Sequence, residues 1–242
     1  MSYMQGRIAH DADSHVMETR EWLDAYVDAE FAGKLRPLYG KRRNPLDDLL
    51  DKAKERKTDP EADAKAADNP IAGPKGWMAY GAFDPDERSR VLDDLGFASQ
   101  LVFPTAGIGP VTAARDEGTR YAASRAYNRA ISAFAADDKR LIPVGYVPLD
   151  DPDAALAGIQ EALRDGCGAI SFSAAAPAER SPGHPLYDPI WSLLSERNVP
   201  FMLHIGPGTK TQPKAFRNNG RERAPDLHGG GENLRFCDYM ML

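Results

Sequence analysis

Three polar side chains near the N-terminus have the types and spacing of a metal-binding group. Asp11, Asp13 and His15 are separated from one another by single residues, and they follow a short apolar run. Because residues i, i+2 and i+4 of a β-strand point to the same face, we expect them to project together from the end of a strand at about residues 6–13. Two carboxylates and an imidazole are part of the ligand set that proteins offer to a divalent transition metal such as zinc.

Four further strands are predicted along the chain, and their sequences are continuously apolar rather than alternating. They cover residues 97–104, 141–148, 167–172 and 199–204. Continuous apolar runs are typical of strands that are covered on both faces, as in a parallel sheet. Helical segments separate these strands, so the sequence predicts an α/β fold.

The intervening helices carry recognisable start and stop signals. Asp84 and Asp151 each precede a proline, which is the pattern of an N-cap followed by the first helical residue, and Gly96 and Gly166 are the corresponding stops. The spacing of apolar residues predicts three more helices, which run from Glu18 to about Phe31, from Thr112 to about Asp138, and onward from Asp188.

Residues 40–82 differ from the rest of the chain because they are dense in charge and poor in core residues. The run from Asp51 to Lys57 is the most highly charged part of this segment. Such a composition favours an exposed insertion that is partly helical or mobile. Its charges are expected to form a solvated face rather than a functional cluster. We therefore expect a single domain over residues 1–242, with a charged insertion at about 40–82.

A further histidine, His204, ends the strand predicted at 199–204. The functional residues of a parallel barrel lie at the carboxyl ends of its strands, so we expect His204 at the same edge as Asp13 and His15. A ligand set of this kind suits zinc, with manganese as the second choice. Asp11 is open to three roles: a ligand, an acceptor that orients His15, or a strand-end residue that accepts turn amides. The last two roles together are favoured over ligation.

Four other polar residues are candidates for catalysis or substrate binding. Glu18 lies near the start of a predicted helix, where it either accepts unpaired amides or acts as an acid or base. His184, in the loop after the fourth strand, is either simply exposed or reaches the substrate. His228 precedes three glycines in the loop after the fifth strand, which indicates a catalytic or pocket role. Arg221 in that loop either binds a substrate carboxylate or is solvated.

The composition of the chain excludes several other classes of function. The net charge of −6 argues against a binder of nucleic acids or anionic membranes, and no apolar run reaches the roughly 18 residues of a membrane span. The two cysteines form no CxxC pair and no secretory signal precedes them, so a reducing cytoplasm is expected. No serine lies in a GxSxG motif, so a serine hydrolase is not indicated.

Several motifs together resemble the amidohydrolase-2 family, which includes aminocarboxymuconate-semialdehyde decarboxylase. They are Asp11-x-Asp13-x-His15, Leu95-Gly96-Phe97, Gln100–Thr105, Gly145–Pro148, Pro185–Trp191 and Val199–His204. The resemblance implies a (β/α)8 barrel with one divalent metal, zinc or manganese, held by Asp13, His15 and His204. It also implies that the chain decarboxylates or hydrolyses a small aromatic or unsaturated carboxylic acid. We further expect a homodimer.

The chain departs from the family pattern in two ways. Asp13 stands where relatives carry histidine or glutamate, and the pattern continues past residue 242 with three more strands and a metal-binding aspartate. We therefore expect an incomplete barrel with about five of the eight strands. Because five strands leave two unpaired edges, the alternative is a catalytically incomplete homologue that is stable only as an oligomer or with a partner chain.

Overall fold

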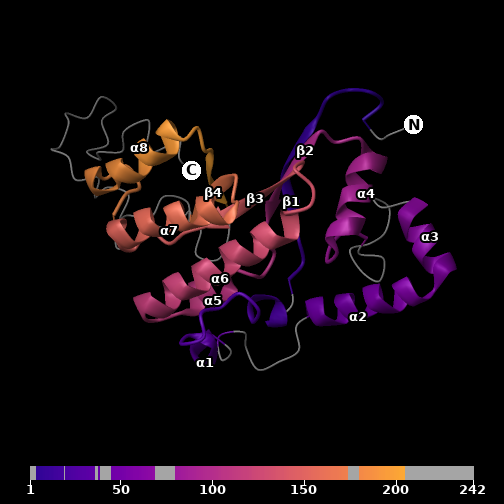
Figure 1. Ribbon diagram of the computed structural model, residues 1–242, viewed down its shortest axis with the longest axis horizontal. Helices are drawn as coiled ribbons and strands as arrows, with labels where there is room; N and C mark the ends of the chain where they lie inside the picture. Colours follow the sequence, from indigo (N-terminus) through magenta and orange to yellow (C-terminus); the bar gives the residue numbers. More distant parts are fainter. Residues whose placement is uncertain are drawn as a thin grey trace, which may run out of the picture.

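A sheet of five parallel strands, in the order β1 to β5, lies at the centre of the computed structural model (Figure 1). The structure describes residues 4–18, 20–35, 38, 45–68, 80–173 and 180–204. The strands are β1 (His10–His15), β2 (Ser99–Phe103), β3 (Leu141–Tyr146), β4 (Ala169–Ser173) and β5 (Phe201–His204). Each strand pairs with the next one along the chain, which is the strand order of a parallel barrel.

The parallel pairing brings the carboxyl ends of the strands to one edge of the sheet. His15 at the end of β1 pairs with Phe103 at the end of β2, and Ser173 at the end of β4 pairs with His204 at the end of β5. The prediction that His15 and His204 both end strands at this edge is confirmed for their backbone positions. This edge is where parallel α/β proteins place their functional residues.

Helices connect the strands and lie beside the sheet. They are η1 (Arg20–Leu23), α1 (Ala32–Leu35), α2 (Pro45–Thr58), α3 (Pro60–Asp68), α4 (Pro85–Leu95), α5 (Gly109–Ala113), α6 (Glu117–Ala135), α7 (Pro152–Asp165), η4 (Pro185–Tyr187) and α8 (Asp188–Glu196). Figure 1 shows α4 beside β1 and β2, with α2 and α3 farther out, whereas α7 and α8 lie toward β4. None of the described helices combines the length and the apolar character that a membrane crossing requires.

The predicted helix caps are confirmed. The Asp84 side chain accepts a hydrogen bond from the Glu87 amide at the start of α4, and the Asp151 side chain accepts one from an amide in the first turn of α7. Gly96 and Gly166 end these helices with φ angles of 77° and 112°. Glycine favours such left-handed conformations because it has no Cβ atom to clash with the backbone.

The helix predicted from Glu18 to Phe31 is wrong. The described part of this segment contains only the short 3-10 helix η1, followed by turns. Its tertiary contacts outweigh the helical spacing of its apolar residues. Asp28 is the clearest case, because its carboxylate accepts hydrogen bonds from Arg125 and Arg129 of α6 at 2.8 and 2.7 Å.

The long helix predicted from Thr112 to Asp138 is divided into α5 and α6. The division occurs because Asp116 starts a new helix: its side chain accepts a hydrogen bond from the Thr119 amide. A side chain that caps helix amides in this way favours a helix start over a continuous helix.

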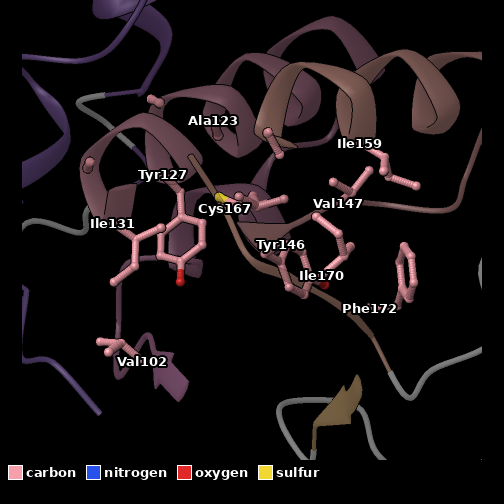
Figure 2. Packing of buried hydrophobic residues seen from close by; sticks show 14 of the residues in the cluster. Val102, Ala123, Tyr127, Ile131, Tyr146, Val147, Ile159, Cys167, Ile170 and Phe172 are labelled. Carbon is pink, nitrogen blue, oxygen red and sulfur yellow. The ribbon is translucent and has the colours of Figure 1, made fainter. Parts of the chain in front are cut away.

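Helix α6 packs on β3 and supplies both apolar and polar groups (Figure 2). The pairing of β3 with β2 ends at Pro143. Beyond that point the Tyr127 hydroxyl donates to the Val144 carbonyl over 2.9 Å, and the Ser124 hydroxyl donates to the Tyr146 carbonyl over 2.6 Å. Side chains of α6 therefore satisfy backbone groups of β3 that lie past the end of the β2 ladder.

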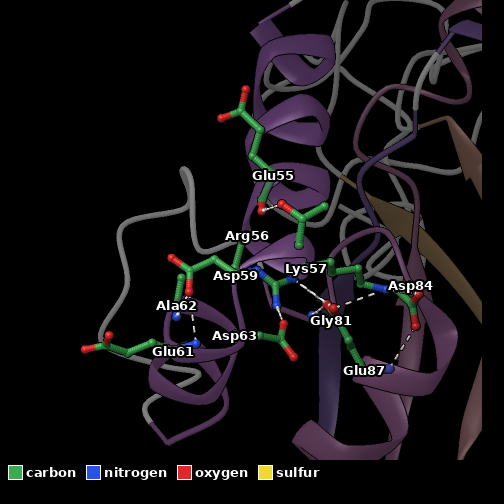
Figure 3. Close-up of polar contacts among 11 residues, drawn as sticks. Glu55, Arg56, Lys57, Asp59, Glu61, Ala62, Asp63, Gly81, Asp84 and Glu87 are labelled. Carbon is green, nitrogen blue, oxygen red and sulfur yellow. Dashed lines mark hydrogen bonds and ion pairs between the residues drawn. The ribbon is translucent and has the colours of Figure 1, made fainter.

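The charged segment is attached to the rest of the domain by a buried ion pair. Arg56 of α2 donates through Nη2 to both carboxylate oxygens of Glu87 on α4, at 2.8 and 2.9 Å, and it also pairs with Asp63 of α3 (Figure 3). Lys57 pairs with Asp84 and Glu87. The prediction of a partly helical segment is confirmed by α2 and α3, but the prediction that its charges lie in solvent is wrong for Arg56, which is buried.

Candidate metal centre at the carboxyl edge of the sheet

A β-bulge shapes the end of β1. Asp11 pairs with Gln100 and Ser14 pairs with Val102, so β1 contains one more residue than β2 over this stretch. A bulge breaks the simple alternation of side chains, and the prediction of an uninterrupted alternating strand over Asp11, Asp13 and His15 is therefore wrong. Strand β1 also begins later than predicted, at residue 10. Even so, the bulge leaves Asp13 and His15 close to each other.

His15 is held in one orientation by a backbone carbonyl. Its Nδ1 atom lies 2.6 Å from the Pro104 carbonyl oxygen, and its ring stacks on Phe103 with a centroid distance of 5.8 Å. A carbonyl oxygen can only accept a hydrogen bond, so Nδ1 carries the hydrogen atom. In the neutral imidazole, Nε2 then bears the lone pair that can bind a metal ion.

The lone-pair side of His15 faces the carboxylate of Asp13. His15 Nε2 and Asp13 Oδ1 are 3.2 Å apart, with 25% of the His15 side chain and 73% of the Asp13 side chain exposed. An imidazole nitrogen and a carboxylate oxygen at this distance are stabilised by a cation, which is either a proton on Nε2 or a metal ion. The pair therefore fits a divalent metal in both its donor types and its exposure at the sheet edge.

Asp11 supports the bulge rather than His15. Its Oδ1 atom accepts a hydrogen bond from the Asp13 amide at 3.1 Å, and its Oδ2 atom accepts one from Gln100 Nε2 at 3.2 Å. Among the three roles left open by the sequence, this geometry matches the acceptor of a turn amide. The orienting role toward His15 belongs to the Pro104 carbonyl instead. Pro104 was missed because a backbone carbonyl leaves no signal in the sequence.

Glu18 lies beneath the loop that follows β2. It is only 2% exposed, and its carboxylate accepts hydrogen bonds from the amides of Thr105 at 3.1 Å and Ala106 at 2.8 Å. A Cβ atom at Gly107 would lie 2.9 Å from Glu18 Oε1, so a larger residue there would require the Glu18 carboxylate to shift. Burial raises the pKa of Glu18 to about 7, although these amides lower it. The contacts give Glu18 an anchoring role for this loop, and its acid or base role stays a prediction.

The raised pKa of Glu18 predicts a specific pH dependence of stability. Between its ordinary pKa of 4.5 and about 7, the unfolded chain has an ionised carboxylate while the native state keeps the proton. The contribution of Glu18 to the free energy of unfolding is therefore expected to fall by about 3 kcal/mol as the pH rises through this window, and to level off above pH 7. Urea denaturation from pH 4.5 to 8 measures this change.

The matched variants for this measurement are Glu18→Gln and Glu55→Gln. Glu18→Gln cannot ionise, so its unfolding free energy is expected to lack this decline. Glu55 is an exposed residue of α2, so Glu55→Gln is expected to follow the wild-type curve. A Glu18→Gln curve parallel to the wild-type one across the whole window would contradict the raised pKa.

Comparison with protein families gives a match over most of the chain. The family model described as Amidohydrolase matches residues 11–227. This chain belongs to the amidohydrolase family. A separate comparison with curated proteins found no match. The family assignment confirms the resemblance seen in the sequence, because the matched region begins at the Asp11 motif and includes His204.

Several solved structures have a fold similar to that of this chain. An amidohydrolase from Mycobacterium avium subsp. paratuberculosis K-10 aligns with a TM-score of 0.59 at 20% identity, over 84% of this chain and 59% of that one. A second similar structure is the 5-carboxyvanillate decarboxylase from Novosphingobium aromaticivorans DSM 12444, solved with manganese and 3-methoxy-4-hydroxy-5-nitrobenzoic acid. It aligns with a TM-score of 0.50 at 17% identity, over 83% of this chain and 51% of the decarboxylase. The 5-carboxyvanillate decarboxylase LigW from Sphingomonas paucimobilis aligns with a TM-score of 0.50 at 17% identity. This alignment covers 90% of this chain and 57% of LigW.

These alignments establish the predicted fold class. The five parallel strands and their helices form part of a (β/α)8 barrel of the amidohydrolase type. The present chain spans about half to three fifths of the length of these solved structures.

The remaining predicted site residues occupy different positions. His204 ends β5, but its side chain lies outside the described structure, as do Arg221 and His228. His184 caps η4: its Nδ1 atom accepts a hydrogen bond from the Leu186 amide at 3.2 Å. This contact gives His184 a local structural role, and its substrate-binding role stays a prediction.

The part of the chain that the structure describes brings together only two of the predicted metal ligands. In those ranges no three histidine, cysteine, aspartate or glutamate side chains gather into a group that could hold a metal ion. Asp13 and His15 form the pair that is present, and the third predicted ligand is the one whose side chain is not described.

Proposed function

We propose that this chain is a metal-dependent decarboxylase or hydrolase that acts on a small aromatic or unsaturated carboxylic acid. The observation that carries the proposal is the fixed tautomer of His15. The Pro104 carbonyl holds Nδ1 of His15, so that Nε2 faces Asp13 at the edge of the sheet where parallel barrels carry out their chemistry.

The identity of the metal follows from the ligand types. Imidazole and carboxylate ligands suit zinc, and they also accept manganese. The structure of one similar decarboxylase contains manganese and an aromatic carboxylic acid, which supports both the metal dependence and the aromatic substrate class. Asp13, His15 and His204 would hold the metal.

Each residue of the site has a distinct part in the proposed reaction. A bound divalent metal supplies Lewis-acid chemistry, which polarises a substrate oxygen or lowers the pKa of water. Arg221 and His184 would bind the substrate carboxylate and orient it. His228 would hold or deliver a proton. Glu18 has a pKa of about 7, which is suited to proton exchange at neutral pH, and it anchors the loop that includes Thr105.

The direct test combines metal binding with turnover. The purified 242-residue chain is titrated with Zn²⁺ and with Mn²⁺ against a chromophoric chelator. It is then assayed with aromatic carboxylic acids labelled with ¹³C in the carboxyl group, and with esters and amides of the same acids. The expected result is one tight metal site and metal-dependent turnover. Release of ¹³CO₂ identifies decarboxylation, and cleaved esters or amides identify hydrolysis.

The negative outcomes are also informative. Metal binding without turnover would favour the catalytically incomplete homologue over the enzyme. A chain that binds neither metal would overturn the proposal.

A further inference from the structure

Arg88 is a buried residue of α4 whose guanidinium group reaches the underside of β1. It is 7% exposed. Its Nη1 atom donates to the Ser14 hydroxyl at 2.7 Å, and its Nη2 atom donates to the His15 carbonyl at 2.7 Å. Its Nε atom donates to the Gly81 carbonyl at 2.5 Å. One rigid planar group thus ties the last two residues of β1 to the chain segment that precedes α4.

The contacts with Ser14 and His15 lie directly after the bulge. Ser14 is the residue at which the pairing of β1 with β2 resumes after the extra residue, and it is buried. A bulge disrupts the ladder locally, so contacts to the residues that flank it help to hold its form. Arg88 donates to the carbonyl of His15, which is one residue past the point where the pairing resumes and whose imidazole faces Asp13.

A second polar contact joins Arg88 to the start of the bulge. Arg88 Nη1 lies 3.5 Å from Gln100 Oε1, and Gln100 Nε2 donates to Asp11 Oδ2 at 3.2 Å. Arg88 therefore reaches both ends of the bulge, directly at Ser14 and through Gln100 at Asp11. The four oxygens that accept hydrogen bonds from Arg88 among the described residues are all neutral.

Burying a cation among neutral oxygens costs desolvation free energy that no opposite charge in direct contact offsets. Burial lowers the pKa of Arg88 to about 10, and the negative charge of Asp11 opposes this effect. The guanidinium therefore remains charged at neutral pH. Buried charges contribute little net stability, and a role in fixing one particular geometry accounts for them better. The geometry that Arg88 contacts is that of the bulge.

We propose that Arg88 is a positioning residue that fixes the bulge of β1 in the form that brings Asp13 and His15 together. Arg88 does not touch the candidate metal site; it acts through Ser14 and the His15 backbone. The significance for metal binding rests on the proposed function, whereas the effect on the conformation of β1 does not.

Arg56 offers a matched control for Arg88. It is also a buried arginine that contacts α4, but it pairs with Glu87 and Asp63 and joins α4 to α2 and α3 (Figure 3). Its replacement removes a buried guanidinium next to the same helix without removing a hydrogen bond to β1. A general loss of packing around α4 would affect both variants, whereas a role in positioning β1 would affect only Arg88.

The test compares Arg88→Met, Arg88→Lys and Arg56→Met in the full 242-residue chain. Amide hydrogen exchange is measured at Val16 and Met17, whose amides donate to Phe103 and Ala82 directly after His15. Arg88→Met is expected to speed exchange there by about tenfold or more, beyond any change at the β4 amides. Arg56→Met is expected to show no such excess. Arg88→Lys is expected to lie between Arg88→Met and wild type, because lysine keeps the charge but not the planar fork.

Metal affinity supplies the second measurement. Arg88→Met is expected to bind Zn²⁺ about 10 to 100 times more weakly than wild type, as is usual when a residue that orients a ligand is lost. The Co²⁺-loaded chain is expected to change its visible spectrum in Arg88→Met and to keep it in Arg56→Met. Unchanged exchange and unchanged affinity in folded Arg88→Met would overturn the proposal.

Two further outcomes are an Arg88→Met variant that does not fold and a wild-type chain that binds no metal. If Arg88→Met does not fold, Ser14→Ala removes one acceptor of the guanidinium, and the same exchange rates at Val16 as in wild type would then overturn the proposal. If wild type binds no metal, the proposed function fails, while the exchange measurements still decide whether Arg88 positions β1.

Discussion

Replacing His15 with alanine is expected to lower the affinity of the chain for Zn²⁺ and Mn²⁺ by about a hundredfold or more. Loss of a residue that only orients a ligand costs up to about a hundredfold, so loss of the ligand itself costs at least as much. The effect follows from the tautomer that Pro104 imposes, which turns Nε2 of His15 toward Asp13. Metal analysis of the dialysed protein and competition with a chromophoric chelator measure the change.

His10 provides the matched control for this prediction. It lies at the other end of β1, where its Nδ1 atom is 2.7 Å from the Ser99 hydroxyl. His10→Ala is therefore expected to bind metal like wild type, although it removes an imidazole from the same strand. Equal affinities of His10→Ala and His15→Ala would show that the site at the end of β1 has been assigned wrongly. Asp13→Asn, which keeps the shape of the side chain and removes its charge, is expected to resemble His15→Ala.

Replacing Tyr127 with alanine is expected to lower the free energy of unfolding by about 4 kcal/mol, as is typical when a large buried aromatic ring is removed. Tyr127 is fully buried in the core (Figure 2). Its ring centroid lies 6.4 Å from that of Trp22. Its hydroxyl also donates to the Val144 carbonyl. Truncation therefore leaves both a cavity and a buried carbonyl without this partner. Urea denaturation at pH 7.5 measures the difference.

Tyr127→Phe separates the two contributions. This variant keeps the ring and removes only the hydroxyl, so the cost is expected to be about 1 to 3 kcal/mol for the Val144 carbonyl that loses its donor. The ring then accounts for the remaining cost of the alanine variant. This division would be contradicted if Tyr127→Phe lost as much free energy of unfolding as Tyr127→Ala. It would also be contradicted if neither variant lost any.

Local signals in the sequence predicted most of the secondary structure. Asp84 and Gly96 mark both ends of α4 because capping and left-handed stops depend on residues that adjoin the helix. The positions of the continuous apolar strands were predicted correctly. A strand that is buried on both faces has an apolar sequence of its own, which can be recognised without knowing its neighbours. The α/β architecture followed from the alternation of these elements, whereas the (β/α)8 barrel was implied by the family resemblance.

The features that the sequence did not reveal depend on contacts between distant segments. The segment after Glu18 has helical spacing, yet it forms no long helix because Asp28 pairs with arginines of α6. The bulge in β1 depends on its register with β2, which no local pattern specifies. Arg88 looks like any other charged residue of an amphipathic helix until β1 is placed beside it. Asp13 and His15 could be proposed as candidate ligands because their residue types and spacing are visible in the sequence itself.

The pairing of β1 with β2 has a consequence for how the protein folds. His15 and Pro104 are 89 residues apart in sequence, whereas β3 and β4 are joined through the single helix α7. Contacts between distant residues pay a larger loop-closure entropy and form later than local ones. The strand with the candidate metal ligands is therefore expected to dock onto an already folded β3–β4 unit. A metal ion bound at Asp13 and His15 would then act mainly after the rate-limiting step, so it would slow unfolding far more than it would speed folding.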